Sequence, residues 1–293
     1  MLTRSSIAAI ISMYILACNN AKPKINMPAL DPGHIGFVLD STAYFDLLND
    51  SFLTREFAQL FVDTSHHPEP LIELYLTGRE AFLNVGLAKD FWQGKAGKGI
   101  MMFQTRKPGE IENLVHNWKQ LYTDSLESYV YEGNGFKIAE VTPHISKSDS
   151  SSKYPNLSIL LASYTIPTYK SWGFSDSVIT NGTSMKDFMN SWDNRTQTKL
   201  FKKFKSFQIQ VTAKELQQIE SDLISVGYTK AENTFIHDDN PTVYFVITTK
   251  NQVPKYTRIE IELAQSTSRR TIQLGNMYTI HINDKEMIIE ASK

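Results

Sequence analysis

The chain has very little cysteine, no excess charge of either sign and no apolar run long enough to cross a membrane. Of its 293 residues, 30 are lysine or arginine and 31 are aspartate or glutamate. This near-neutral balance argues against nucleic acid as a partner, because phosphate binding needs a concentrated positive surface. A single cysteine excludes an internal disulfide framework and every metal site built from several cysteines. Aromatic residues make up 11% of the chain, which is typical of an ordered globular protein.

The first residues have the pattern of a bacterial lipoprotein signal. Arg4 is followed by the apolar run 7–16, which is shorter than the roughly 20 residues that span a bilayer and fits the core of a signal peptide. The run ends in Ile15-Leu16-Ala17-Cys18, which resembles a lipobox. That resemblance implies a lipid on Cys18, cleavage before it, and a mature protein held at a membrane. The alternative is a plain signal peptide in which the cysteine occurs by chance.

Residues 1–18 are therefore interpreted as a lipoprotein signal peptide with its lipobox. Residues 19–32 are polar and contain proline, which predicts a tether that holds the folded part away from the membrane. No acidic run of the kind that some bacteria use for surface export follows Cys18. We therefore expect a lipid-anchored protein of the bacterial cell envelope that faces the periplasm.

The rest of the chain repeats one order of elements, strand then helix then strands. The first block predicts a strand, a helix after Asp40-Ser41 that continues through Phe61, and two more strands, at 34–39, 41–61, 71–76 and 81–87. The second predicts a strand at 100–104, a helix beginning at Lys107-Pro108, and strands at 129–131, 136–141 and 157–162. The third predicts a strand at 207–211, a helix that Thr212 and Glu215 cap and Gly227 ends, and strands at 243–248, 257–263, 270–274, 277–282 and 287–291.

Three such blocks indicate a repeated supersecondary unit. The pattern resembles the vicinal-oxygen-chelate superfamily of glyoxalases and extradiol dioxygenases, whose βαβββ units pair around a site. A closer resemblance, to a family of glyoxalase-like bacterial proteins, rests on GHIGFVLD (33–40), YLTGREAFLN (75–84) and SYTIPTYKSW (163–172), and covers about residues 33–190. It implies an α+β fold in which paired βαβββ units form a curved mixed sheet at 33–195. An additional α+β block, itself similar to a further unit, follows at 196–293.

The same resemblance implies where a site would lie. In the superfamily, His, Glu or Gln side chains on the concave face hold a divalent metal that acts as a Lewis acid. His34 stands at the first ligand position, but the next two hold Asn84 and Ser163, which replace anionic ligands poorly. We therefore expect a small-ligand pocket without a cofactor, with Gln104 as a further lining residue. The alternative is a metal-dependent lyase, isomerase or dioxygenase with one divalent metal, for which His34 and Glu140 are the candidate ligands.

An aromatic group follows the last strand of the second block. Tyr164, Tyr169 and Trp172 flank a proline, and aromatic walls with a few polar groups are usual in small-molecule pockets. The group therefore either rims the cavity or packs in the core.

Other candidate motifs predict structure rather than chemistry. His66-His67 is expected in a solvated, proline-rich loop, and 237–241 in a turn that lacks the spacing of a calcium loop. The segment 94–99 misses the phosphate-loop pattern, and no Gly-x-Ser-x-Gly is present. The leading hypothesis is therefore a lipid-anchored envelope protein that binds a small ligand without metal catalysis. An envelope module that only contacts other proteins is a further alternative.

Overall fold

The computed structural model describes residues 28–67, 69–89, 95–110, 112–113, 116, 128–133, 136–141, 156–250 and 252–292. The predicted signal peptide, the predicted lipid-attachment residue Cys18 and nearly all of the predicted tether lie outside these residues, as does most of the predicted helix after Lys107. No helix within the described ranges is long and apolar enough to cross a membrane.

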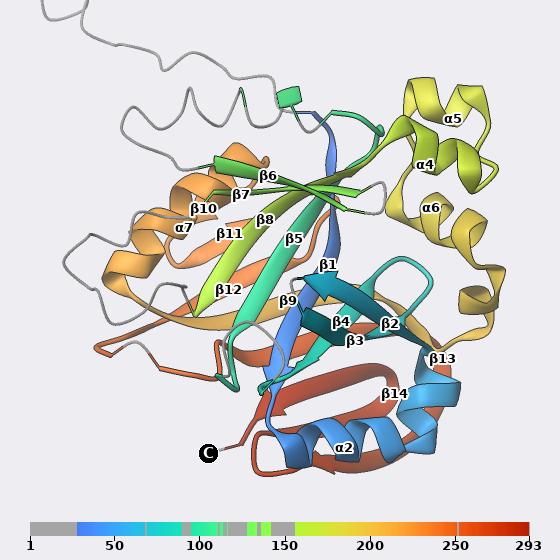
Figure 1. Ribbon diagram of the computed structural model, residues 1–293. Helices are drawn as coiled ribbons and strands as arrows, with labels where there is room; N and C mark the ends of the chain where they lie inside the picture. The colour runs from blue at the N-terminus through green and yellow to red at the C-terminus, as the bar shows by residue number, and fades with distance from the viewer. Residues whose placement is uncertain are drawn as a thin grey trace, which may run out of the picture.

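The described chain folds into two mixed β-sheets with few helices, so the α+β class is confirmed (Figure 1). The first sheet has the order β2-β3-β4-β1-β5-β8-β7-β6. Its strands are β1 (Leu30–Leu39), β2 (Gln59–His67), β3 (Glu69–Thr77), β4 (Phe82–Leu87), β5 (Gly99–Thr105), β6 (Ser128–Gly133), β7 (Phe136–Val141) and β8 (Leu157–Tyr164). The second sheet has the order β10-β11-β12-β9-β13-β14. Its strands are β9 (Phe201–Thr212), β10 (Thr229–Ala231), β11 (Thr234–Ile236), β12 (Thr242–Thr248), β13 (Tyr256–Leu274) and β14 (Tyr278–Ala291).

One arrangement of strands recurs three times. In the first half of the eight-stranded sheet β1 lies parallel to β4, with β3 and β2 beyond it. In the second half β5 lies parallel to β8, with β7 and β6 beyond it, and the antiparallel pair β1–β5 joins the halves. In the second sheet β9 lies parallel to β12, with β11 and β10 beyond it. There β13 pairs antiparallel with β9, in the place that β5 has beside β1.

Short helices lie between these strands in the described part of the chain, and all but η1 have a side-chain N-cap. They are α2 (Ser41–Asn49), the π-helix η1 (Phe52–Phe57), α4 (Ile166–Ser171), α5 (Asp176–Asn181), α6 (Met185–Trp192), the 3-10 helix η2 (Asn194–Thr198) and α7 (Ala213–Ser225). The Asp40 carboxylate accepts the Ala43 N–H at the start of α2. The predicted capping box of Thr212 and Glu215 is present at the start of α7. Gly227 then follows the helix with a φ of +99°, a conformation that glycine adopts without strain.

Two local predictions are wrong because the pairing of β2 with β3 overrides the local pattern. The predicted helix through Phe61 ends at Phe57, and the chain then enters β2, which pairs antiparallel with β3. His66-His67 belongs to the same strand rather than to a loop, opposite Pro70 and Glu69. The β3 partners of Leu60 and Phe61 are Leu76 and Tyr75, which lie outside a local sequence window, so the helical spacing of apolar residues was the misleading signal there.

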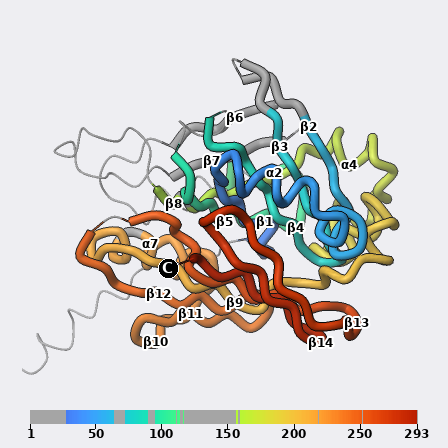
Figure 2. The backbone as a smooth tube through the Cα atoms, turned by 90° about the horizontal axis from the view of Figure 1, so that it is seen from below, coloured from blue at the N-terminus to red at the C-terminus, as the bar shows by residue number. Residues whose placement is uncertain are grey.

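The C-terminal strands are longer than predicted. The expected strands 257–263 and 270–274 form the single strand β13, and 277–282 and 287–291 form β14. The pairing register of β13 with β14 shifts between Glu262 and Arg270, where most residues are polar, and the two strands then continue as one pair. In Figure 2 the two strands run side by side as one long hairpin.

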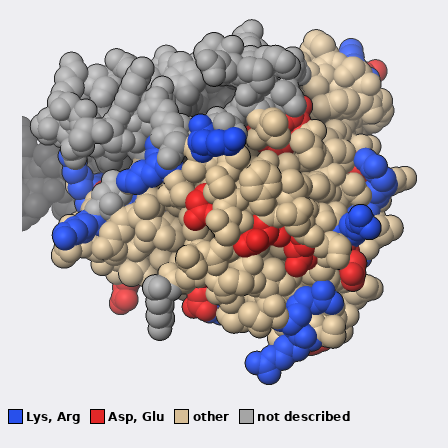
Figure 3. All heavy atoms as spheres, turned by 60° about the horizontal axis from the view of Figure 1, so that its bottom comes forward, with Lys and Arg blue, Asp and Glu red and all other residues tan. Residues whose placement is uncertain are grey.

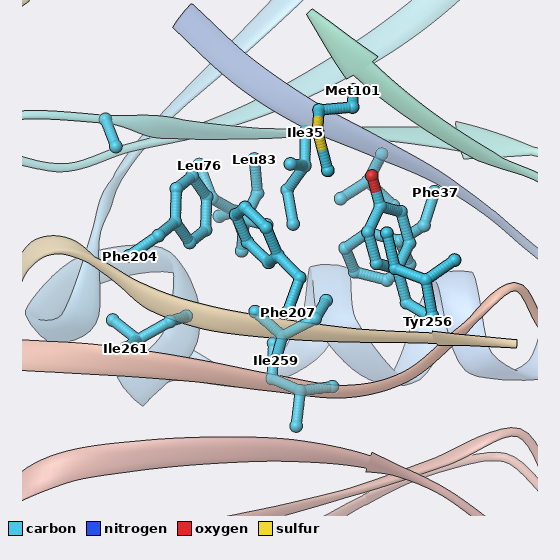
Figure 4. Packing of buried hydrophobic residues seen from close by; sticks show 14 of the residues in the cluster. Ile35, Phe37, Leu76, Leu83, Met101, Phe204, Phe207, Tyr256, Ile259 and Ile261 are labelled. Carbon is cyan, nitrogen blue, oxygen red and sulfur yellow. The ribbon is translucent and has the colours of Figure 1, made fainter. Parts of the chain in front are cut away.

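One continuous apolar core joins the two sheets. Side chains that alternate along β1, such as Ile35 and Phe37, face Phe207 of β9 and Ile259 of β13 (Figure 4). Tyr256 of β13 lies fully buried in this layer, and its hydroxyl donates to the Ile100 carbonyl of β5. Because this layer covers one face of the first sheet, any site on that sheet must use the opposite face.

The end of the β13–β14 hairpin reaches back to the N-terminal helix. The Gly275 N–H donates to the Asp46 carboxylate over 2.8 Å, and the Asp40 N–H donates to the Met277 sulfur over 3.2 Å. The Arg270 guanidinium lies 3.8 Å from the centre of the Phe52 ring, where its charge meets the π-face. We call these contacts the hairpin clasp.

Acidic and basic side chains are interspersed on the face that Figure 3 shows. Ion pairs link β9 to its neighbour β13 and to β14 beyond it, where Lys202 lies 2.6 Å from Glu262 and Lys205 lies 2.6 Å from Glu286. All four side chains are partly exposed, so each pair adds about 1 kcal/mol or less to stability.

Candidate functional site

The face of the first sheet that points away from the core carries polar and aromatic side chains. Alternation places them there, because their neighbours in each strand point into the apolar layer between the sheets. Register confirms the grouping, since His34 lies opposite Phe82, and Tyr75 lies opposite Asn84. We call the set the polar face: His34 of β1, Glu73 and Tyr75 of β3, Phe82 and Asn84 of β4, Gln104 of β5 and Tyr164 of β8.

Three short helices, α4, α5 and α6, cover part of this face and form what we call the cap. Aromatic side chains fill the contact, with Tyr169 and Phe174 4.7 Å apart between ring centres and Phe188 stacked 5.6 Å from Tyr164. Trp172, at 36% exposure, closes the edge of the cluster, 4.8 Å from Tyr164. The three predicted aromatic residues therefore do meet, and they pack the cap against the sheet.

His34 is buried and uncharged. Its ring stacks on Phe82 with 4.4 Å between ring centres, and only 7% of the residue is exposed. Desolvation by this burial lowers the pKa of the imidazole to about 3, so the ring is neutral at physiological pH. Among the described residues the imidazole has no hydrogen-bond partner. The ring therefore offers one donor and one acceptor to a ligand.

Asn84 belongs to a hydrogen-bonded group in which one acceptor stays open. Its Nδ2 donates to Glu73 Oε1 over 3.0 Å, and the Tyr75 hydroxyl donates to Glu73 Oε2 over 3.0 Å. Burial and the Glu73 charge raise the pKa of Tyr75 far above its usual value, so the phenol keeps its proton. Asn84 Oδ1 is buried with no partner. An acceptor in that state costs about 1–3 kcal/mol, which a donor from a ligand would recover.

Gln104 lies at the cap side of the polar face. It is buried against Gly33, where an added Cβ would come within 3.1 Å of the Gln104 Cβ. Its side chain is a hydrogen-bond partner of the Tyr169 hydroxyl, although burial, the larger influence, raises the pKa of that phenol to about 12. Gln104 therefore connects the sheet to the cap.

Two other candidates are placed differently. Ser163 points to the opposite face of β8. There its hydroxyl oxygen accepts a hydrogen bond from the Thr105 hydroxyl over 2.7 Å and another from the Glu110 N–H over 3.3 Å. These bonds tie β8 to the turn after β5, so Ser163 is not part of the polar face. Glu140 lies in β7 opposite Leu160, and its side chain lies outside the described residues.

Sequence reasoning missed Glu73 and Tyr75. Both lie in the segment LIELYL, where they alternate with the core residues Leu74 and Leu76. Two-residue periodicity therefore could have placed them together on the face away from the core. Their link to Asn84 could not be foreseen, because it depends on the register between β3 and β4.

The polar face has few ligands for a divalent metal. Within the residues that the structure describes, no three His, Cys, Asp or Glu side chains gather in a metal-binding group. His34 is a suitable ligand type, but both Glu73 oxygens are already bonded, to Asn84 and to Tyr75. This set offers fewer free anionic donors than catalytic metal sites use.

A partly buried ion pair fixes the cap beside the polar face. Arg106, after β5, bonds Asp31 of β1 through two nitrogens, the closer contact being 2.8 Å. Asp31 Oδ2 also accepts the N–H of Met185, the first residue of α6, over 2.9 Å. Arg106 lies 3.5 Å from Asp239, and a cavity of about 260 Å³ opens beside these groups. Asp31 therefore holds sheet and cap together.

Replacing Asp31 by asparagine should loosen the cap. The change keeps the side-chain size but removes the charge from bonds to Arg106 and Met185, which should cost about 1–3 kcal/mol in unfolding free energy. Chemical denaturation measures the loss, and hydrogen exchange should quicken at the first turn of α6. The matched control is Asp176→Asn, an exposed aspartate in the first turn of α5. Equal exchange at Met185 in both variants would contradict the role of Asp31.

The fold and the polar face define an α+β protein with a cluster of polar side chains under a helical cap. The chain belongs to a family of unknown function, DUF5829, whose model matches residues 33–290. A solved structure of a hypothetical protein from Staphylococcus aureus is 14% identical, with a TM-score of 0.48, over 83% of this chain and 95% of that chain. A protein of Bacillus subtilis subsp. subtilis str. 168 described as a "putative dioxygenase" is 9% identical, with a TM-score of 0.30, over 87% and 82%. No curated protein matches the chain.

Proposed function

We propose that this chain is a lipid-anchored protein of the bacterial cell envelope, with a glyoxalase-like fold, that binds a small ligand on its polar face without a metal. The observation that carries the binding proposal is the buried, unpartnered Asn84 Oδ1 on the same face as the uncharged His34. A folded chain keeps such a group at a cost in stability, and a ligand that donates a hydrogen bond to it would remove that cost. The aromatic cap supplies the apolar wall that small-molecule sites use.

The strand order supports the glyoxalase-like interpretation. Each half of the first sheet begins with a strand that lies parallel to the last strand of the same half, and the two halves meet at the pair β1–β5. That is the arrangement expected of two βαβββ units. His34 lies at this junction, on β1, opposite Met102 of β5.

The metal-dependent alternative has one observation in its favour, which is that Glu73 places a carboxylate on the same face as His34. We expect the full chain, extracted in detergent, to carry no stoichiometric divalent metal, because both Glu73 oxygens are occupied. Elemental analysis after purification without chelators measures this. A stoichiometric metal that disappears in His34→Ala, but remains in the surface variant His281→Ala, would establish the enzyme alternative instead.

The anchor is tested separately, because it rests on the sequence alone. Cys18→Ser should move the protein from the membrane to the soluble fraction, since the thioether-linked lipid can then no longer form. Fractionation followed by immunoblotting measures the change, and incorporation of a labelled fatty acid should fall with it. Asn19→Ser, next to the same position, should leave the protein at the membrane. Unchanged membrane retention of Cys18→Ser would refute the anchor.

A further inference from the structure

We infer that the polar face recognises an uncharged group that both donates and accepts hydrogen bonds, a carboxamide or a hydroxyl. This inference rests on the proposed function, since it names the chemical class of the ligand at the same site. Three features of the face carry it: the open acceptor on Asn84, the imidazole of His34, and the charge around them.

The orientation of the Asn84 amide is determined by its neighbour. Its Nδ2 donates to the Glu73 carboxylate over 3.0 Å, and the reversed amide would place two oxygens against each other. Oδ1 therefore points away from Glu73, buried and without a partner. Only a hydrogen-bond donor can satisfy it, so the ligand must bring an N–H or O–H group.

His34 lies close enough to contact the same small group. It is opposite Phe82 on the neighbouring strand, and Asn84 is two residues further along that strand. Strand spacing places the two Cα atoms about 8 Å apart. Both side chains stand on the same face of the sheet, and the neutral ring supplies one donor and one acceptor. A group that donates to Asn84 Oδ1 and exchanges a hydrogen bond with His34 needs both donor and acceptor character.

The charges around the face exclude ions of either sign. The polar face contains the Glu73 carboxylate and no lysine or arginine, so an anion would meet repulsion without a partner. A cation would lose its hydration in the same environment that keeps His34 unprotonated. Glu73 does not offset that loss, because its two oxygens are already bonded. Uncharged ligands avoid both costs.

Three probes of nearly equal size test the inference on the full chain in detergent. Acetamide is an uncharged donor and acceptor, acetate is its isosteric anion, and N,N-dimethylacetamide keeps the acceptor but has no donor. Each is titrated while NMR follows the His34 imidazole and the Asn84 side-chain amide. We expect saturable shifts with acetamide, and at least tenfold weaker effects with the other two, equivalent to about 1.4 kcal/mol.

The outcomes separate the two proposals. If acetate or dimethylacetamide binds as tightly as acetamide, the inferred ligand class is wrong, although the polar face is still a binding site. No response of either side chain to any of the three probes would overturn the site itself. Because these comparisons use the wild-type chain, they do not depend on a variant that folds.

A variant pair adds a second measurement. Asn84→Leu removes the open acceptor and should abolish the saturable acetamide shift at His34. Gln208→Leu is the matched control, because it removes a carboxamide from β9 of the second sheet. There Gln208 Oε1 accepts a hydrogen bond from the Thr257 hydroxyl over 2.9 Å. This control should leave acetamide binding unchanged. Retained binding in a folded Asn84→Leu protein would contradict the inference.

Discussion

Replacing Glu215 by leucine should lower the free energy of unfolding by about 3–5 kcal/mol at pH 7. Its carboxylate lies 2.9 Å from the ammonium group of Lys255, whose side chain is fully buried. Burial lowers the pKa of Lys255 and Glu215 opposes that effect, so removing Glu215 leaves a buried cation without a counterion. Glu215 also completes the capping box of α7, which adds about 1 kcal/mol to the loss. Urea denaturation followed by circular dichroism measures the change.

The reciprocal variant provides the control. Lys255→Met removes the buried charge. The Glu215 carboxylate still accepts the Thr212 N–H over 2.8 Å, and its side chain is 12% exposed, so the expected loss of unfolding free energy is smaller than for Glu215→Leu. The double variant should be more stable than the sum of the two single losses predicts, because no charge is then left unpaired. Additive losses would show that the two side chains do not interact.

The protein should lose stability as the pH falls from 6.5 towards 3, through His34. The folded-state pKa of His34, about 3, lies below the unfolded value of 6.5. Protons therefore bind the unfolded chain first, and the stabilisation is complete only above pH 6.5. Between pH 7 and pH 5 this group should remove about 2 kcal/mol, at about 1.4 kcal/mol per pH unit below 6.5.

Substitution of His34 isolates its contribution. His34→Gln keeps a polar side chain that does not titrate, so the difference in unfolding free energy between pH 7 and pH 5 should shrink by about 2 kcal/mol. Phe82→Leu removes the stacked ring but keeps the histidine. This variant should lower the unfolding free energy at both pH values and leave the difference between pH 7 and pH 5 unchanged. An unchanged pH dependence in His34→Gln would mean that the imidazole has the same pKa in the folded protein as in the unfolded chain.

Local signals in the sequence predicted the elements that depend on local contacts. The helix from Ala213 to Ser225 was predicted from its Thr–Glu capping box, its apolar stripe and its terminal glycine, all within one short segment. The strand predicted at 34–39, which lies within β1 (Leu30–Leu39), was equally clear, because it is buried on both faces and has a continuous apolar run. In such segments, residues close in the sequence determine the capping of the backbone and the burial of the side chains.

Features that depend on register were not predictable from one sequence. Ser163 and Tyr164 are adjacent, yet only Tyr164 lies on the polar face, because the pairing of β8 decides which of the two points away from the core. Glu73 reaches Asn84 only because β3 and β4 align Tyr75 opposite Asn84. Three of the residues proposed from the sequence, His34, Asn84 and Gln104, therefore share one face of the sheet, whereas the Glu73 carboxylate beside Asn84 was missed.

The hairpin clasp constrains the order in which the chain can fold. Helix α2 is synthesised near the start of the folded part, but Gly275 and Met277, which contact Asp46 and Asp40, follow more than 200 residues later. Until they arrive, the outer side of α2 and the ring of Phe52 lack their native cover. Contacts that distant in sequence slow folding, because a long loop must close before they form. The N-terminal half of the protein can therefore complete its packing only after almost the whole chain has been made.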